Sequence, residues 1–207
     1  MGFNGGVSLI LLALIPAAYV IGMFPSAPLV ARSRGVDITT QGSGNPGASN
    51  VSRVLGWKSG VLVFALDAAK GAIAAGGGWA IDGRLGAYFC VAAAALGHMY
   101  PVLHRFGGKR FAGGKGVATV GGAMFVLEPI VSSVLLAVWF GVSRLTKKAS
   151  VASIAIIGLL PIGAAIVGTP GREIAAMAAL GVLVMLKHTA NIKRLIRREE
   201  LALGKNP

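Results

Sequence analysis

Three clusters of Gly, Ser, Asn, His and basic residues carry groups that could bind an anion, and the first reads GSGNPGASNVSR at residues 42–53. A glycine-rich backbone exposes N–H groups that can form an anion nest, and Ser and Asn side chains add donors. Asn50 and Arg53 are three positions apart, so they would share a face if a helix starts here. A turn that caps a helix has a similar composition, and this cluster alone leaves both interpretations open. The candidate ligands are Ser43, Asn45, Asn50 and Arg53.

The second cluster, GGKRFAGGKGVAT at residues 107–119, places a lysine among glycines where the next apolar segment begins. Flexible backbone and an ammonium group at a helix N-terminus suit phosphate. The cluster differs from a Walker A loop, because Lys115 is followed by Gly116 where that motif has Ser or Thr. A basic anchor at the membrane interface is the alternative. The candidate ligands are Gly113, Gly114, Lys115 and Gly116.

The third cluster, KHTANIKRL at residues 187–195, again sets two polar residues three positions apart, His188 and Asn191. A lone histidine near a membrane interface is more often structural, so this cluster alone does not decide between structure and function. Ser150 and Ser153 would also share a helix face, beside two lysines. On their own they are ordinary packing residues.

Asp67 and Lys70 lie inside an apolar segment, where ionisable groups are unusual. At a spacing of three residues they can form an ion pair. A structural pair is the simpler interpretation, although charge within a membrane also marks functional sites.

The composition is typical of an integral membrane protein. Of the 207 residues, 55% are hydrophobic and only 13% are charged, and the mean hydropathy is +0.73. Soluble domains are nearer a quarter charged. The net charge of +13 could indicate nucleic acid, but basic loops on one membrane side explain it better in so apolar a chain. Cys90 is the one cysteine, which excludes an intramolecular disulfide.

The elements that must position these clusters are apolar segments at roughly 7–31, 59–81, 85–103, 117–143, 149–167 and 173–187. The connections 32–58, 104–116 and 144–148, with the tail from Lys187, hold 17 of the 20 basic residues. Basic loops belong on the cytoplasmic side. All four can lie there only if segment 117–143 crosses the membrane twice.

Segment 117–143 is therefore predicted to be a hairpin of two short helices, with Glu128-Pro129 at its midpoint. Each half is shorter than the ~20 residues that a full span needs. The prediction is an all-α integral membrane protein of about seven transmembrane helices, in a single domain over residues 1–207. The N-terminus would be outside and the C-terminus cytoplasmic, with every polar cluster facing the cytoplasm.

Several kinds of catalytic motif are absent from the sequence. No His is followed five positions later by Asp, and there is no GxSxG elbow. Metal-ligand spacing is limited to the weak pair His98 and His104, and we expect neither a metal nor a cofactor. Few bases and many anion-binding groups suit a reaction whose substrates carry phosphate, where the protein mainly positions and neutralises.

Together the three clusters resemble the bacterial acyl-phosphate-dependent glycerol-3-phosphate acyltransferases. That family has the motifs SGNxGATNxxR, GHxxPxxxxFxGGKGVAT and HxxNIxRL. Here they read SGNPGASNVSR at 43–53, GHMYPVLHRFGGKRFAGGKGVAT at 97–119 and HTANIKRL at 188–195. The chain departs from the pattern in having Ser49 where the family has Thr, and in about five extra residues before GGKG.

The resemblance implies transfer of a fatty acyl group from acyl phosphate to the 1-hydroxyl of sn-glycerol 3-phosphate, the first step of phospholipid synthesis. Arg53 and Lys115 would neutralise phosphate, while His188 and Asn191 would orient the donor or the acceptor. Ser43, Asn45, Asn50, Ser150 and Ser153 would hold oxygens, and Gly113, Gly114 and Gly116 would supply backbone donors. The acyl tail would lie among the helices, and the protein would be located in the bacterial inner membrane. An upstream enzyme that forms acyl phosphate would supply the donor.

Two functions of other classes remain open from the residues themselves. Polar, glycine-rich loops between apolar helices could line the path of an anion or phosphate-ester transporter. Transport predicts polar groups at mid-membrane and an internal repeat, and the polar groups here collect mainly at one side. A basic membrane scaffold without chemistry is the weaker option.

Overall fold

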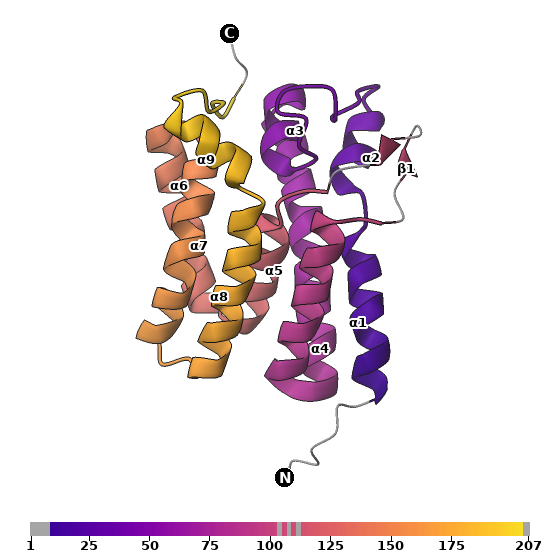
Figure 1. Ribbon diagram of the computed structural model, residues 1–207, viewed down its shortest axis with the longest axis vertical. Coiled ribbons are helices and arrows are strands. Elements are labelled where there is room, and N and C mark those ends of the chain that lie inside the picture. The colour runs from indigo at the N-terminus through magenta and orange to yellow at the C-terminus, as the bar shows by residue number, and fades with distance from the viewer. Residues whose placement is uncertain (1–8, 103–104, 107–108, 111–112, 205–207) are drawn as a thin grey trace.

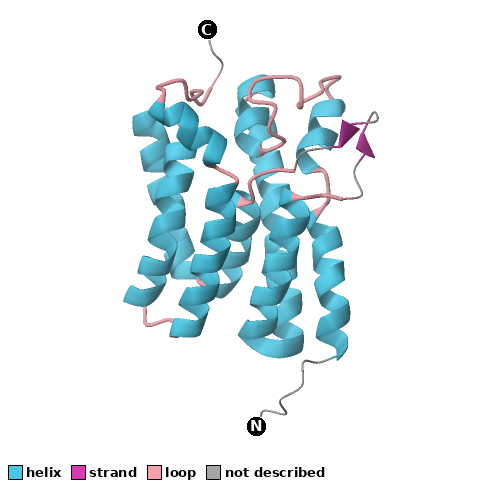
Figure 2. Ribbon diagram, viewed as in Figure 1, coloured by secondary structure: helices cyan, strands magenta, loops and turns pink. Residues whose placement is uncertain are grey.

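The computed structural model describes residues 9–102, 105–106, 109–110 and 113–204, which form an upright bundle of helices (Figure 1). The described helices are α1 (Leu9–Gly22), α2 (Ser26–Arg32), α3 (Ala48–Leu55), α4 (Trp57–Met99), α5 (Val117–Leu127), α6 (Pro129–Thr146), α7 (Ala149–Ile166), α8 (Gly171–Leu186) and α9 (Thr189–Ile196). Figure 2 shows loops mainly at the two ends of the bundle. The helical membrane fold expected from the sequence is confirmed.

One small sheet departs from a purely helical chain. Strand β1 (Arg105–Phe106) pairs antiparallel with β2 (Lys109–Arg110) in the segment that carries the extra residues. The remaining residues between 103 and 112 lie outside the described part of the chain. The sequence did not predict this hairpin.

Helix α4 contains two of the expected membrane segments joined without a loop. The backbone is non-helical at Asp82 (φ −141°, ψ 32°) and Gly83 (φ 61°, ψ −157°), and the chain reverses there. The positive φ of Gly83 combined with its extended ψ is a conformation essentially restricted to glycine. The limbs touch closely, since a Cβ on Gly78 would lie 2.5 Å from the Gly86 carbonyl oxygen.

The predicted hairpin over 117–143 is present as α5 and α6, which meet at Glu128 (φ −137°, ψ 65°). Pro129 begins α6, a position where its missing N–H has no helical partner to lose. One detail was wrong: α6 continues to Thr146, and its 18 residues are long and apolar enough to cross a membrane. Only α5, with 11 residues, is short. The extra crossing brings the basic connections to the same end of the bundle, as the distribution of charge along the sequence required.

Helix α5 is too short to span a bilayer alone, and it packs along α4 through glycines. A Cβ on Gly71 would lie 1.7 Å from the Thr119 carbonyl oxygen, and one on Gly122 would lie 2.0 Å from that of Ala68. Small residues let membrane helices approach this closely. The contact holds the start of α5, and with it the GGKG turn, against the middle of the bundle.

Among the described residues, four helices are long and apolar enough to cross a membrane, or five if α8 and α9 form one span bent by 61°. Helix α4 counts once among these, although it reverses. Large apolar side chains such as Leu9, Ile130 and Ile166 are exposed on the outside of the bundle. They give the bundle the apolar exterior of a multi-pass membrane protein.

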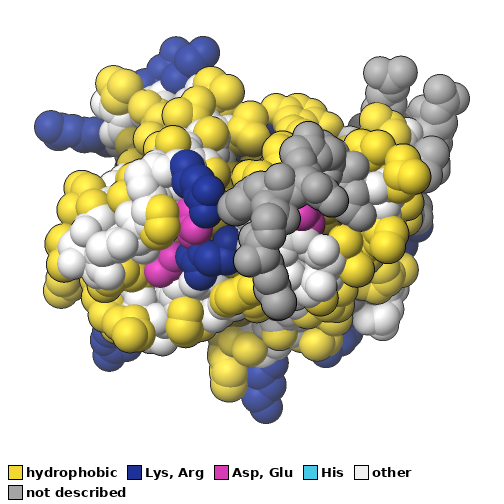
Figure 3. All heavy atoms as spheres, turned by 90° about the horizontal axis from the view of Figure 1, so that it is seen from below, with side chains coloured by type: hydrophobic (Ala, Val, Ile, Leu, Met, Phe, Trp, Pro, Cys, Tyr) yellow, Lys and Arg dark blue, Asp and Glu magenta, His cyan; other side chains and the backbone are white. Residues whose placement is uncertain are grey.

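The two ends of the bundle differ in character. Short helices α3 and α9 and the C-terminal tail lie at the upper end in Figure 1. At the lower end Arg84 joins three turns: its Nε is 2.5 Å from Glu173 Oε2, it pairs with Glu128, and its Nη1 donates to the Leu127 carbonyl at 2.9 Å. From that end (Figure 3), a small group of basic and acidic side chains lies within a largely apolar surface. The polar clusters therefore belong to the upper end.

Candidate active site

A cavity of about 550 Å³ lies inside the upper part of the bundle and combines two kinds of lining. Polar groups come from the loop before α3, from α3, the turn before α5, the start of α7, the α8–α9 junction and the tail. Apolar groups come from the inner faces of the long helices. They include Val61, Phe64, Met124, Leu135, Trp139, Ile157 and Leu160. One space can thus hold a charged group and an alkyl chain together.

Ten of the twelve predicted site residues line this cavity. They are Ser43, Asn45, Asn50, Arg53, Lys115, Gly116, Ser150, Ser153, His188 and Asn191. Gly113 and Gly114 instead line a small neighbouring space. The structure therefore brings together groups separated by more than a hundred residues.

Asn50 organises the loop before α3. Its Nδ2 donates to the carbonyls of Ile38 (3.3 Å) and Gln41 (2.9 Å), and its Oδ1 accepts from the Ser43 N–H at 2.9 Å. Gly42 has a φ of +59°, and a Cβ there would lie 2.3 Å from Asn50 Oδ1. Both functional atoms of the amide are thus used within the protein, and Asn50 holds the loop in shape.

Arg53 shares a face of α3 with Asn50, as their spacing predicted. Its Nη1 donates to Asn50 Oδ1 at 3.1 Å and its Nε to the Ala202 carbonyl at 2.9 Å. Burial lowers the pKa of Arg53, and Glu200 opposes that effect. The guanidinium is thus fixed by α3 on one side and by the tail on the other, with its charge held at the cavity.

The GGKG turn sets Lys115 at the cavity wall. Gly116 caps α5 with a φ of +86°, in the left-handed region that favours glycine. The pKa of Lys115 is lowered to about 8, mainly by burial; nearby Glu200 opposes this shift, and Arg194, Arg53 and Lys187 add to it. Within the described part of the chain no hydrogen bond partners its ammonium group. An anion in the cavity would stabilise its charged form.

His188 and Asn191 lie buried at the junction of α8 and α9. His188 Nδ1 is 2.8 Å from the Val184 carbonyl, so Nδ1 carries a proton and donates it to that oxygen; when the ring is neutral, Nε2 is therefore the acceptor. Asn191 Nδ2 donates to Glu200 Oε1 at 2.6 Å. Ser153 accepts a 3.1 Å bond from the Trp139 indole N–H, and Ser150 is buried at the start of α7.

Sequence reasoning missed the C-terminal tail. Glu200 binds Asn191 and also accepts a 2.8 Å bond from Arg194 Nε, and both Glu200 and Arg194 line the cavity. Burial raises the pKa of Glu200, but hydrogen bonds led by that of Asn191 outweigh it, and the net shift is downward. The only sequence signal was an acidic pair in a basic tail. In the described residues no group of three metal-ligating side chains is found.

The model of the family described as glycerol-3-phosphate acyltransferase matches residues 11–198 of the chain. A glycerol-3-phosphate acyltransferase of Aquifex aeolicus (strain VF5) is 38% identical over 192 residues, 91% of this chain and 97% of that protein. One from Clostridioides difficile (strain 630) is 38% identical over 204 residues, 95% of this chain and 96% of that protein.

Two crystal structures of PlsY (YgiH), an integral membrane glycerol 3-phosphate acyltransferase, are similar in fold. The glycerol 3-phosphate form has a TM-score of 0.86 at 38% identity and covers 94% of this chain and 96% of that chain. The lysophosphatidic acid form has a TM-score of 0.84 at 37% identity, with 93% and 95% covered.

Fold, cavity and relatives together define a membrane-embedded acyltransferase. The chain belongs to the glycerol-3-phosphate acyltransferase family. The enzyme class expected from the motifs is confirmed, and the transporter and scaffold alternatives are set aside.

Proposed function

We propose that this enzyme takes its acyl group from acyl phosphate and transfers it to the 1-hydroxyl of sn-glycerol 3-phosphate. The products are lysophosphatidic acid and inorganic phosphate. The observation that carries the proposal is the single cavity in which cationic groups meet an apolar lining. Relatives crystallised in glycerol 3-phosphate and lysophosphatidic acid forms support the acceptor and the product.

The proposed roles follow from the contacts of each residue. Arg53 and Lys115 neutralise the two phosphates, because both are partly buried cations at the cavity wall. Ser43, Asn45, Ser150 and Ser153 hold substrate oxygens, and His188 and Asn191 orient the donor or the attacking hydroxyl. Asn50 acts through Arg53 and the loop, since its own amide is already bonded. Of the turn glycines, Gly116 lines the main cavity, while Gly113 and Gly114 line the small neighbouring space and shape the turn.

The reaction is a direct displacement without an acyl-enzyme. The 1-hydroxyl oxygen attacks the acyl carbonyl carbon, and the bond from that carbon to the phosphate oxygen breaks. Phosphate leaves with the bonding electrons, and a substrate phosphate oxygen takes the hydroxyl proton. The mixed anhydride is already activated, so the protein acts by positioning and by stabilising the charge that develops.

The proposed setting is the bacterial inner membrane with the cavity open to the cytoplasm. The basic connections at the upper end of the bundle support this orientation. The acyl chain would lie in the apolar part of the cavity, and surrounding lipid would receive the product. An upstream enzyme that forms acyl phosphate would supply the donor.

The donor is tested with purified protein, acyl phosphate and glycerol 3-phosphate. We expect phosphate release that depends on both substrates and matches the lysophosphatidic acid formed. Activity with acyl-CoA or acyl-carrier protein, and none with acyl phosphate, would correct the donor. Isolation of acylated protein after incubation with labelled acyl phosphate would overturn direct attack.

The two cations are tested by removing each in turn. Lys115→Ala and Arg53→Ala should each lower kcat/KM at least ~100-fold, the range seen when an oxyanion contact is lost. Thermal unfolding in detergent checks that each variant is folded. Near-normal turnover in either folded variant removes that residue from the site.

A further inference from the structure

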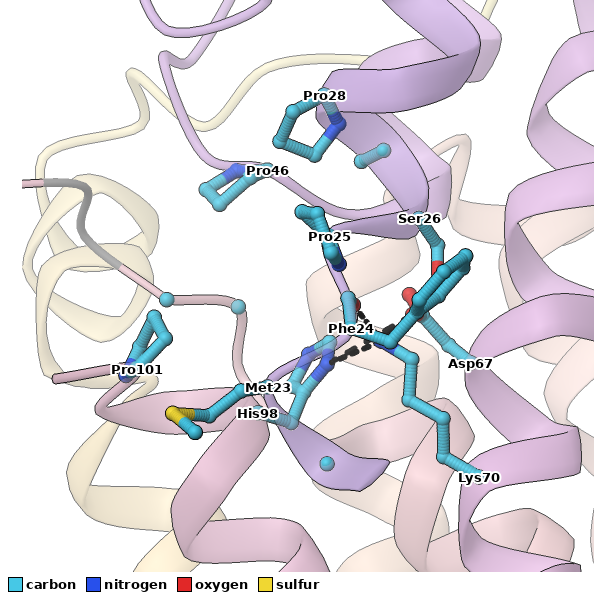
Figure 4. A pocket seen from close by; sticks show the side chains of 14 residues that line it. Met23, Phe24, Pro25, Ser26, Pro28, Pro46, Asp67, Lys70, His98 and Pro101 are labelled. Carbon is cyan, nitrogen blue, oxygen red and sulfur yellow. Dashed lines mark hydrogen bonds and ion pairs between the residues drawn. The ribbon is translucent and has the colours of Figure 1, made fainter. Parts of the chain in front are cut away.

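Asp67, Lys70 and His98 form a buried cluster of three ionisable side chains (Figure 4). Through His98 the cluster contacts the GGKG turn. Lys70 Nζ is 2.7 Å from Asp67 Oδ1, donates to the Phe24 carbonyl at 2.6 Å, and lies 3.5 Å from His98 Nδ1. His98 Nδ1 is 3.7 Å from Asp67 Oδ1. The cluster thus links both limbs of α4 to the break between α1 and α2, where Phe24 lies.

The imidazole of His98 occupies the space beside Gly114. The Gly114 N–H donates to the His98 carbonyl at 3.1 Å. A Cβ on Gly114 would lie 2.1 Å from His98 Nε2, and its three nearest atoms would all belong to that ring. The side chain of His98 and the backbone of the turn are therefore in direct contact.

Asp67 and His98 both line the main cavity. An Asp and a His in such a position could be interpreted as a general-base dyad. The geometry argues against it, because Nε2 faces Gly114 and Nδ1 faces the Asp67–Lys70 pair. Both ring nitrogens thus face protein groups, and the His98 side chain is only 9% exposed. With a neutral ring the cluster carries no net charge, which suits its burial.

We propose that Asp67, Lys70 and His98 are positioning residues that fix the GGKG turn and so aim Lys115 into the cavity. The ion pair holds the ring, the ring abuts Gly114, and Lys115 is the next residue. The proposal rests on the proposed role of Lys115. It predicts that small changes in this cluster act on catalysis through the turn, since misplacing a catalytic group by ~1 Å can cost about 100-fold in rate.

The test is a double-mutant cycle between Gly114 and His98. Gly114→Ala alone should lower kcat/KM by about 100-fold, because its methyl group collides with the ring. In the His98→Ala background the obstacle is gone, and the same substitution should cost at least about tenfold less. An equal cost of Gly114→Ala in both backgrounds would overturn the proposal.

Gly113 provides the matched control one residue away in the same turn. A Cβ there would meet the backbone oxygens of His98 (2.3 Å) and Met99 (2.4 Å), which His98→Ala leaves in place. Gly113→Ala should therefore be equally damaging in both backgrounds, and its rescue by His98→Ala would contradict the proposed contact. If Gly114→Ala does not fold, recovery of folded protein in the double variant supports the contact, and failure to recover it counts against it.

The ion pair is tested by Asp67→Asn, with Arg84→Gln as control at the far end of the bundle. Both variants should unfold at a lower temperature, but only Asp67→Asn should raise the KM of the phosphate substrate that Lys115 holds. A lower unfolding temperature with unchanged KM and kcat in Asp67→Asn would show a purely structural pair. If Lys115→Ala proves fully active, the proposed function loses that residue, while the Gly114–His98 coupling still tests the contact.

Discussion

Three cations line the cavity, Arg53, Lys115 and Arg194, together with two carboxylates, Glu200 and Asp67, of which Asp67 is paired with Lys70. Arg53, Lys187 and Arg194 act electrostatically on Lys115, and Glu200 alone opposes them. This surplus of positive charge is unfavourable in the empty site and favourable once a phosphate enters. At the scale of single residues, the site is an anion-binding site whose positive charge is neutralised when its phosphate substrates bind.

The charge of Lys115 predicts how substrate binding depends on pH. Burial lowers the pKa of Lys115 to about 8, so the ammonium is charged below that value and becomes neutral as the pH rises through it. The KM of the phosphate substrate held by Lys115 should therefore be flat up to about pH 7 and rise as the pH passes through about 8.

Lys115→Arg is the control for this pH dependence, because a guanidinium stays charged over the whole range. We expect the variant to be less active but to show no rise in KM near pH 8. Steady-state kinetics with each substrate varied in turn make the measurement. An unchanged pH profile in Lys115→Arg would assign the titration to another group.

Glu200 predicts a different kinetic effect, since it positions Asn191 and Arg194. In Glu200→Gln the loss of charge-assisted bonds should lower kcat about tenfold. KM should not rise, because the variant makes the site more positive. Exposed Glu199 is the matched control, and Glu199→Gln should leave both constants unchanged; equal effects of the two variants would refute the special role of Glu200.

At the scale of elements, glycines decide how closely α5 approaches α4. Gly71→Ala should push the two helices apart, because its Cβ would lie 1.7 Å from the Thr119 carbonyl oxygen. Overpacking of this kind costs about 1–3 kcal/mol. The expected result is a lower unfolding temperature in detergent and reduced activity, since α5 carries the GGKG turn at its start.

Gly76 lies on the same limb of α4 and is the matched control. A Cβ there would meet nothing within 4 Å, so Gly76→Ala should be neutral or slightly stabilising through its better helix propensity. If the two alanine variants unfold at the same temperature, close packing at Gly71 does not limit stability.

The α5–α6 hairpin shows how far elements could be predicted. The basic loops on both sides of segment 117–143 required this segment to cross the membrane twice, and Glu128-Pro129 marked the turn between its two helices. The shortness of α5 was predicted as well, whereas the length of α6 was not. Helix ends depend on local capping and neighbours, which hydropathy does not report.

At the scale of the whole molecule, the bundle separates a polar upper end from a lower end closed by Arg84 and its two carboxylates. Orientation in the membrane is tested with single cysteines after Cys90→Ala. Arg172→Cys at the lower end should react with an impermeant thiol reagent in intact cells. Lys193→Cys at the upper end should react only after permeabilisation, and the opposite pattern would invert the proposed topology.

The sequence by itself determined the membrane class, the order of the apolar segments and three motifs rich in anion-binding groups. These follow from hydropathy, charge and spacing, which are local properties of the chain. The single-domain organisation over residues 1–207 stays a prediction.

Only the tertiary structure decided which groups share the cavity and what each one contacts. Arg53 is fixed by the carbonyl of Ala202, 149 positions away. The side-chain amide of Asn50 forms hydrogen bonds within its own loop, and the His98 ring lies beside Gly114. The physical reason is that hydrogen-bond partners and close contacts arise where distant segments meet. Composition and spacing along one chain do not contain that information.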